Sequence, residues 1–451
     1  MQRIEVKNFG PLKDINLEIK DYMVFIGPQA SGKSTLAKLI YFFWKIEDKF
    51  RDETIPSYAI SKVLGTSPEH EDYIENWKDD FRKMFSDIFP TYRTGEIIFS
   101  YTDINEITFN VSKYVERVSD DILLSQGIYK GITKVDSQLE QLPNLADFYH
   151  NQKGLFNGLL ELLSNDFFSD NKNISSRPST MLREFIPAGR SILSILSNSF
   201  TFLDNNNLDY FTENFIRFTN KVRKFLNSPD YDFLYGRKTS SYFPVNDIIS
   251  LTNQLSLNIL KGDFLIGEKG DGIVHYNNDF NFFIPIKNTS SGQQESAWLI
   301  NSIRYILFDS NSTSHDIIIE EPEANLFPDA QRDITKLITL LSVEQKNKTR
   351  LIITTHSPYV LATLNNSIKA FTTAQIENKS EEVEKILSKE FWINPENLFV
   401  GFMNKNEGDD YFGIKDIYDG EIGLISHQVL DQVSDEIMKQ FDELLDIQYS
   451  E

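Results

Sequence analysis

The fold of this chain is decided by residues 27–35, GPQASGKST, which directly follow the apolar segment YMVFI at 22–26. The apolar segment predicts a buried strand, and the apolar residues after Lys33 recur at helical spacing. Glycines allow backbone N–H groups to surround an anion, and a helix N-terminus adds the positive end of its dipole. The stretch therefore predicts a phosphate-binding loop between a strand and a helix, rather than a plain turn with an exposed lysine.

This loop predicts a nucleotide site for ATP and Mg²⁺. Lys33 is expected to reach the β- and γ-phosphates, and the Ser34 hydroxyl is expected to ligate the metal ion. The loop residues expected to contact the nucleotide are Gly27, Gln29, Ala30, Ser31, Gly32, Lys33, Ser34 and Thr35. A working site also needs groups from elsewhere in the chain.

A second apolar run ends in two consecutive carboxylates. Residues 317–319 are all isoleucine, and Glu320 and Glu321 follow them. Open α/β sheets place ligands at the carboxyl ends of their strands, and successive side chains on a strand point in different directions. We therefore expect Glu320 to hold the metal ion and Glu321 to polarise the attacking water. The alternative is a strand that simply ends in acidic surface residues.

Two further motifs carry groups suited to the same site. Residues 290–294, SSGQQ, begin a predicted helix, where Ser291, Gly292 and Gln293 offer a hydroxyl, backbone N–H groups and the helix dipole to a phosphate. His356 follows the apolar segment LIITT. Each motif has an ordinary alternative when taken alone, because polar glycine turns begin many helices and a histidine after a strand is often only packed or capping.

The composition is that of a globular protein without thiol chemistry. The 451 residues are 40% hydrophobic and include no cysteine, which excludes disulfides and thiolate metal sites. No segment has the length of a membrane helix and residues 1–10 lack an apolar signal core, so we expect a cytoplasmic protein that does not enter a membrane. The net charge of −21 argues against broad binding of duplex DNA through its phosphates.

The sequence pattern divides the chain into four parts. Residues 1–112 hold the phosphate loop and a predicted hairpin at 96–111, while residues 241–376 hold the other motifs, among strands that alternate with helices. Helical patterns dominate residues 113–240, which are expected to form an insertion. Residues 377–451 carry 19 acidic residues and six lysines, a charge of −13. We therefore predict an ATPase core in two parts, with a helical insertion and an acidic C-terminal segment.

Together the motifs resemble the ATP-binding-cassette (ABC) branch of P-loop ATPases, and within it the soluble SMC-like and OLD-like proteins. The resemblance covers residues 1–45 and about 262–370. There, IEEPEANLFP resembles the extended Walker B motif and D-loop, TTHSP the switch-histidine strand, and RIEVKNFGPLKDINLEI the opening strand–loop–strand. The resemblance implies an α/β protein with the ABC-type P-loop ATPase fold, containing a mixed sheet, an antiparallel β lobe and a helical insertion. It also implies that Asn8 and Phe9 lie near the base and that His356 acts with Glu321 in catalysis.

The resemblance further implies a dimer. In this branch the signature turn, here Ser291, Gly292 and Gln293, contacts the ATP bound to a second subunit, so that two chains clamp two nucleotides and hydrolysis releases them. Gln293 stands where the usual signature has a second glycine, and Glu320 stands where Walker B usually has an aspartate. Both variants resemble those of OLD-like relatives.

Several other residues keep two interpretations each. Arg190 either senses the γ-phosphate or makes a surface ion pair. The basic face formed by Arg217, Lys221 and Lys224 either meets nucleic acid or is a solvated face above a core stripe. Residues 422–445 predict an amphipathic helix with its apolar side on the core, whose acidic side either docks a basic partner or is simply solvated. The glutamine of a Q-loop stays unassigned among Gln126, Gln138 and Gln141.

Three classes of function fit such a chain. The first is an ATPase subunit of a bacterial anti-phage or DNA-maintenance system that acts with a separate nuclease or toxin. The second is a self-contained OLD-like nuclease, and the third is the motor of a membrane transporter. The segment after His356 is expected to be too short for the nuclease's metal-binding domain, and transporter motors lack a helical insertion of this size. We therefore expect the first class, working as a homodimer or higher homo-oligomer through its ATP sites, with nucleic acid as a possible ligand. A nucleotide switch with little hydrolysis is the remaining alternative.

Overall fold

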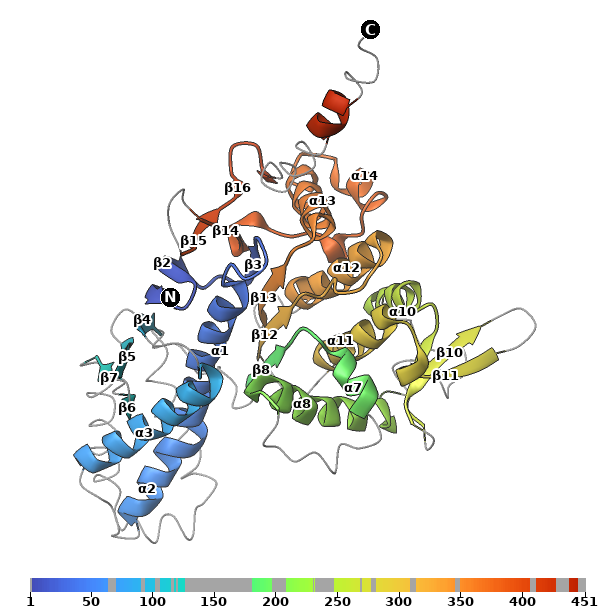
Figure 1. Ribbon diagram of the computed structural model, residues 1–451. Helices are drawn as coiled ribbons and strands as arrows, with labels where there is room; N and C mark the ends of the chain where they lie inside the picture. Colours follow the sequence, from blue (N-terminus) through green and yellow to red (C-terminus); the bar gives the residue numbers. More distant parts are fainter. Residues whose placement is uncertain are drawn as a thin grey trace.

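The structure is a computed structural model, drawn in Figure 1. It describes residues 2–63, 70–90, 94–101, 106–114, 117–118, 121–125, 181–196, 208–229, 231, 247–267, 270–276, 281–308, 314–344, 349–405, 411–426 and 438–444. Within these residues no helix combines the length and the apolar composition that crossing a bilayer requires.

A six-stranded mixed sheet forms the centre of the molecule. Its strands are, in spatial order, β15 (Gly413–Asp416), β14 (Leu398–Asn404), β3 (Tyr22–Ile26), β13 (Thr349–Thr355), β12 (Ser314–Glu320) and β8 (Met181–Ile186). All pairings are parallel except that of β14 with β15. The three central strands are rich in isoleucine and valine, as expected for a parallel sheet that is buried on both faces.

Helices cover both faces of this sheet (Figure 1). Along β3, Met23 and Phe25 belong to a core shared with α1 (Lys33–Lys49), whereas Val24 and Ile26 belong to a second core. The helices of that second core include α11 (Ser291–Phe308), α12 (Pro328–Glu344) and α13 (Pro358–Ala374). The alternation of side chains along β3 thus joins two helical layers through one strand.

An antiparallel lobe packs on the α1 side. Its strands are β1 (Arg3–Phe9), β2 (Leu12–Glu18), β4 (Thr94–Ser100), β5 (Glu106–Tyr114), β6 (Arg117–Val118) and β7 (Asp121–Leu124). The predicted hairpin at 96–111 corresponds to the β4–β5 pair. The π-helical turn η1 (Phe50–Thr54), α2 (Ile55–Val63) and α3 (His70–Ile88) continue from α1, and their aromatic side chains join the core of the lobe.

The remaining elements are smaller. They are α7 (Ser191–Leu196), α8 (Tyr210–Leu226), α10 (Asp247–Leu260), β9 (Asp263–Leu265), β10 (Gly272–Tyr276), β11 (Asn281–Pro285), η3 (Ile286–Asn288), α14 (Ser380–Glu384), η4 (Lys389–Phe391), η5 (Pro395–Asn397), β16 (Tyr418–Asp419) and β17 (Leu424–Ile425). The predicted fold class, an α/β protein with a mixed sheet and an antiparallel β lobe, is confirmed.

Two strands of the central sheet lie outside the predicted core segments. β8 falls within residues 113–240, expected to form a helical insertion, yet it pairs with β12 along its whole length. β14 falls within the acidic segment 377–451, yet it pairs with β3. The sequence-based boundaries therefore cut through the sheet.

The predicted helix at 422–445 is wrong at its start. Leu424 and Ile425 form β17, and Asn365 of α13 holds Ile425 by accepting from its N–H (2.7 Å) and donating to its carbonyl (3.0 Å). Farther along, Phe441 is 53% exposed and Leu444 is 65% exposed, so these apolar side chains do not lie on the core. Residues 427–437 lie outside the described part of the chain.

Candidate functional site

The phosphate-loop segment has the predicted strand–loop–helix form. β3 ends at Ile26, and α1 begins at Lys33 with Gly32 as its N-cap residue. Gly32 has a φ of 95°, and a Cβ there would lie 2.5 Å from Leu12 Cδ2. Glycine is therefore required at this position both by backbone conformation and by the approach of β2.

Lys33 is folded back on its own loop. Its ammonium donates to the carbonyls of Gly27 (2.9 Å) and Pro28 (2.7 Å). Burial lowers the pKa of Lys33 to about 8, even though the carboxylates of Glu321 and Glu323 favour its charged form. The Lys33 ammonium is thus bound to two carbonyls of its own loop. A phosphate that binds in the loop would have to replace these carbonyls as its hydrogen-bond partner.

Three side chains from the segments that follow three neighbouring strands form a connected set. His356 follows β13, and its Nε2 lies 3.2 Å from Glu321 Oε1, just past β12. Its Nδ1 lies 3.5 Å from the Lys33 ammonium. Because an ammonium can only donate, the neutral tautomer with hydrogen on Nε2 satisfies both contacts. The set is therefore Lys33 donating to His356, and His356 donating to Glu321.

Glu321 is held as a carboxylate in an unusual backbone conformation. The hydrogen bond from His356 lowers its pKa, and the charges of Lys33 and Arg190 act in the same direction, although burial opposes them. Its φ of 41° lies in the left-handed region, which side chains other than glycine rarely adopt. Its N–H donates to Thr354 O on β13 (2.9 Å), which fixes the turn. Such strain commonly occurs at functional positions.

Arg190 braces this turn from behind. The residue is only 1% exposed, and its guanidinium donates to the carbonyls of Glu320 (2.7 Å) and Glu321 (3.0 Å). It also donates to the carbonyls of Pro187 (2.8 Å) and Glu295 (3.0 Å). Arg190 does form an ion pair, with the Glu295 carboxylate at 3.7 Å, but it is buried and not at the surface as expected. A role in sensing the γ-phosphate is not supported, because the guanidinium ties β8, β12 and α11 together.

Glu320 has the environment of a metal ligand. The side chain is 5% exposed, and its Oε2 accepts from the Ala188 N–H (3.3 Å). Its buried Oε1 has no hydrogen-bond partner among the described residues. A buried carboxylate oxygen without a donor fits a cation such as Mg²⁺. The described part of the chain contains no group of three or more histidine, aspartate or glutamate side chains arranged to hold a metal ion.

Glu323 is a site residue that the sequence analysis did not single out. Its Oε1 accepts from the Thr355 hydroxyl (2.7 Å) and from the backbone N–H of His356 (2.8 Å). These bonds fix the position of the histidine relative to the turn at Glu321. The residue stands in the quoted IEEPEANLFP motif, but its partners lie more than thirty residues away on another strand, so only its place in the motif pointed to it.

Gln293, which stands where the usual signature has a second glycine, makes several hydrogen bonds in this turn. Ser290 Oγ accepts from the Gln293 N–H (3.3 Å), and Gln293 Oε1 accepts from the Ser290 N–H (3.2 Å). This reciprocal pair is a capping box at the start of α11. Gln293 Nε2 also donates to Leu260 O (2.6 Å), so the glutamine fastens the turn to α10. Gly292 is needed for packing, because a Cβ there would lie 2.6 Å from Asn325 O.

Asn8 and Phe9, which were both expected near the base, differ in their exposure to solvent. Asn8 is exposed and has a φ of 52° at the end of β1. Phe9 is fully buried, with its ring 5.7 Å from Phe85 and 5.3 Å from Phe89. The expectation that Phe9 lies near the base is therefore corrected: the alternation of buried and exposed residues along β1 breaks at Asn8, and the Phe9 ring lies in the lobe core.

The basic face of α8 lies above a core stripe. Arg217 pairs with Glu213 (2.5 Å), and Lys221 lies 3.6 Å from Glu184. On the other side of the helix, residues such as Phe215 and Phe218 are buried. These contacts favour the solvated-face interpretation over a nucleic-acid surface. The Q-loop candidates Gln126, Gln138 and Gln141 lie outside the described residues.

Comparison with known proteins gave one family and several solved structures. The family described as AAA ATPase domain matches residues 1–361. The SMC head domain from Thermotoga maritima aligns with 92% of this chain and 98% of its own, at 9% identity and a TM-score of 0.34. The Smc head domain with an extended coiled coil, bound to the C-terminal domain of ScpA and derived from Pyrococcus furiosus, aligns over 97% and 100%, at 11% identity and 0.36. A dimeric bacterial ABC transporter cassette aligns over 80% and 90%, at 11% identity and 0.27. No curated protein matched.

Proposed function

This chain belongs to the family of AAA ATPase domains, and on that premise we propose that it binds and hydrolyses ATP and that ATP joins two copies of it. The observation that carries the proposal is the contact of Lys33, His356 and Glu321 at the ends of three adjacent parallel strands. This sheet edge is where open α/β proteins bind ligands.

The residues of this set divide the work between binding and chemistry. On binding, Lys33 exchanges the carbonyls of Gly27 and Pro28 for the β- and γ-phosphates. The Glu321 carboxylate accepts a hydrogen bond from the attacking water and takes its proton. His356 orients Glu321, and Glu323 holds the backbone of His356 in place.

Ser34 and Glu320 are the proposed Mg²⁺ ligands, supported by the unpartnered Oε1 of Glu320. When bound, the ion would neutralise phosphate charge. The loop residues from Gly27 to Thr35 and the exposed Asn8 complete the proposed nucleotide contacts.

We propose that the signature turn of one copy contacts the ATP held by the other. Ser291 is exposed at the start of α11, and the capping box gives the turn a fixed shape without nucleotide. Close by, Phe327 is 78% exposed and Tyr359 is 48% exposed, beside the D-loop and the switch histidine. Exposed aromatic side chains of this kind are typical of protein contacts.

Ser291→Arg is expected to abolish ATP-dependent dimers while leaving ATP bound to the chain's own phosphate loop. The larger, charged side chain is placed at the turn that is proposed to contact the second copy. Lys33, which is proposed to bind the chain's own ATP, is unchanged. Light scattering in Mg²⁺ and ATPγS measures the mass, and calorimetry measures nucleotide affinity. Ser380→Arg, an exposed serine at the start of α14, is the matched control. A dimer in the Ser291→Arg protein equal to that of the wild type would refute this interface.

ATP affinity is expected to fall with rising pH once the pH exceeds the Lys33 pKa of about 8 in the empty protein. The triphosphate favours the ammonium, so affinity is fully present below this pKa and drops by up to about tenfold per pH unit above it. Calorimetry at pH values on both sides of the pKa checks this. Lys33→Ala should bind about ten- to a hundredfold more weakly below the pKa, with a flat pH profile. A flat profile in the wild type would contradict the role of Lys33.

We also propose a separate effector protein, as in cytoplasmic anti-phage or DNA-maintenance ATPases. The support is that the chemical groups found at the sheet edge all serve ATP, and that the acidic segment 377–451 carries −13 of charge suited to a basic partner. Purified protein is expected to leave plasmid DNA intact in Mg-ATP. DNA cleavage by this chain alone would favour the self-contained nuclease instead.

A further inference from the structure

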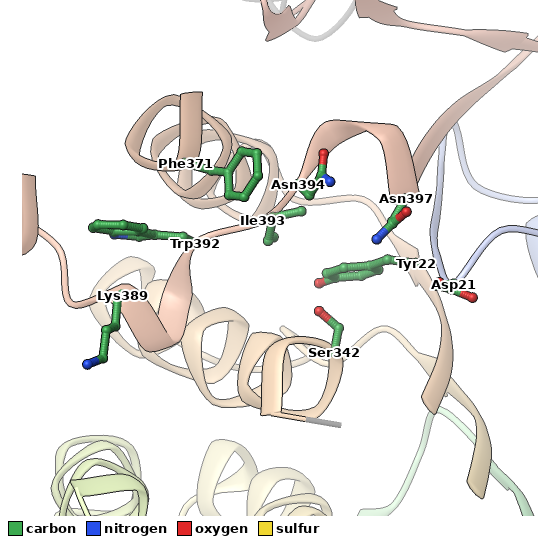
Figure 2. Close-up of a pocket in the computed structure, with 9 residues that line it drawn as sticks. All are labelled: Asp21, Tyr22, Ser342, Phe371, Lys389, Trp392, Ile393, Asn394 and Asn397. Carbon is green, nitrogen blue, oxygen red and sulfur yellow. The ribbon is translucent and has the colours of Figure 1, made fainter. Parts of the chain in front are cut away.

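A cavity of about 190 Å³ lies at the opposite end of β3 from the phosphate loop (Figure 2). Its walls come from the first residue of β3, from α12 and α13, and from the segment that contains η4 and η5. The rings of Phe371 and Trp392 line the cavity and are partly exposed, so its apolar wall meets solvent. Figure 2 shows the charged groups of Asp21 and Lys389 at opposite ends of the cavity, directed outward. The other lining residues are Tyr22, Ser342, Ile393, Asn394 and Asn397.

A second uncovered apolar surface lies on the C-terminal helix, residues 438–444. Met438, Phe441 and Leu444 are 58%, 53% and 65% exposed. Residues three apart on a helix are neighbours on its surface, so these three side chains share one face. Figure 1 shows the helix beyond the ends of α13 and α14, away from the central sheet. An apolar face of this kind, left in water on the described chain, indicates a contact with another molecule.

We propose that the C-terminal helix of a second copy docks on this cavity, with the Phe441 ring inside it. A cavity of roughly 150 Å³ accommodates benzene, so the space here fits one phenyl ring, which Phe371 and Trp392 can pack against. The apolar surface continues beyond the cavity, because Ile376 at the end of α13 is 59% exposed and Ile386 is 87% exposed. These isoleucines offer cover for the other two side chains of the helix face.

Charge at one end of the cavity favours the same occupant. Asp442 is exposed and adjoins Phe441 at the edge of the helix face. The Lys389 ammonium is directed outward from the cavity and lies 4.0 Å from the exposed Glu384, a long distance for an ion pair. A helix seated with Phe441 in the cavity can place Asp442 at this end, where the opposite charges attract.

The occupant is a second copy because each chain carries both surfaces and leaves both uncovered. Two copies that exchange their C-terminal helices satisfy both contacts at once and form a closed pair. None of the proposed ATP contacts belongs to the cavity or to the helix. The pair therefore forms without nucleotide, and together with the proposed ATP clamp it would join copies into a larger assembly.

The first test measures the mass of the full chain without nucleotide, where the ATP clamp is not formed. Light scattering over a range of protein concentrations is expected to show monomers joining into dimers. Phe441→Asp should weaken this dimer by about ten- to a hundredfold, because one phenyl ring loses its burial. It should unfold at the wild-type temperature, since Phe441 is exposed in the single chain. Ile422→Asp, the same change at a side chain that is 64% exposed outside the helix, is the matched control and should dimerise as the wild type does.

The second test shows which surface is covered. The chain has no cysteine, so Ser342→Cys places a single thiol in the cavity at the cost of one exchanged atom. Its reaction with a bulky maleimide is expected to slow as the protein concentration rises, and adding Phe441→Asp should remove this protection. Protection that is independent of concentration would place the helix in its own chain's cavity and overturn the proposal. A thiol that is never protected, or a nucleotide-free chain that stays monomeric, would also overturn it, and none of these outcomes bears on the ATP site.

Discussion

Glu321→Gln is expected to slow ATP hydrolysis by about 10²–10⁴-fold while ATP still binds. The amide keeps the size of the side chain but cannot take a proton from water. In the wild type the hydrogen bond from His356 lowers the pKa of Glu321, so the carboxylate is ready to accept. Phosphate release in a single turnover measures the rate. Light scattering should show that the variant accumulates as a dimer in Mg-ATP.

The matched control is Glu421→Gln, an exposed glutamate after β16, which should hydrolyse ATP at the wild-type rate. His356→Ala should have a milder effect than Glu321→Gln, because it misorients the carboxylate without removing it. A Glu321→Gln protein that stays monomeric in saturating Mg-ATP would exclude the clamp. Unchanged hydrolysis would exclude Glu321 as the proton acceptor.

Arg190→Met is expected to destabilise the fold by about 3–5 kcal/mol, the range for removing one partner from a buried charged set. The change leaves the buried Glu295 carboxylate without its cation, at 3.7 Å in the wild type. It also leaves the carbonyls of Pro187, Glu295, Glu320 and Glu321 without their donor. In the unfolded chain these carbonyls bind water, so the loss of the arginine raises the free energy of the folded state only. Denaturant unfolding followed by circular dichroism measures the loss.

Arg217→Met serves as the comparison, because Arg217 is an exposed arginine paired with Glu213 on α8. Exposed pairs contribute about 0–1 kcal/mol, so this variant should unfold close to the wild type. In the Arg190→Met protein that remains folded at low temperature, hydrolysis should also fall, since the turn at Glu321 loses its brace. Equal stability of the two variants would show that the Arg190 bonds do not support the fold.

The phosphate loop could be predicted because its determinants are local. Gly27, Gly32 and Lys33 stand within seven residues, and all three belong to the same loop between β3 and α1. Glu321 and His356 could be named as separate motifs, but their contact depends on the parallel pairing of β12 with β13, which places their strand ends side by side. The sequence motifs therefore identify Glu321 and His356 as candidate residues, but only the pairing of the strands shows that the two side chains are in contact.

The role of Arg190 could not be predicted, because all of its hydrogen-bond acceptors are backbone carbonyls. Every residue has a carbonyl, so no residue type at Glu295 or Glu320 signals the bond. Burial of Phe9 was missed for a similar reason, since its neighbours Phe85 and Phe89 come from α3 and the segment just after it. The membership of β8 and β14 in the central sheet depends on pairings across long stretches of chain.

The place of β14 beside β3 has a consequence for synthesis of the protein. During translation β3 emerges first, but its neighbours β13 and β14 follow only after residues 349 and 398 have been made. Until then the strand that leads into the phosphate loop has free edges, which invite pairing with other chains. The sheet that supports the phosphate loop is thus complete only after β14, Leu398–Asn404, has been made. Slow ribosomes or early stops should consequently yield aggregation rather than a partial ATPase.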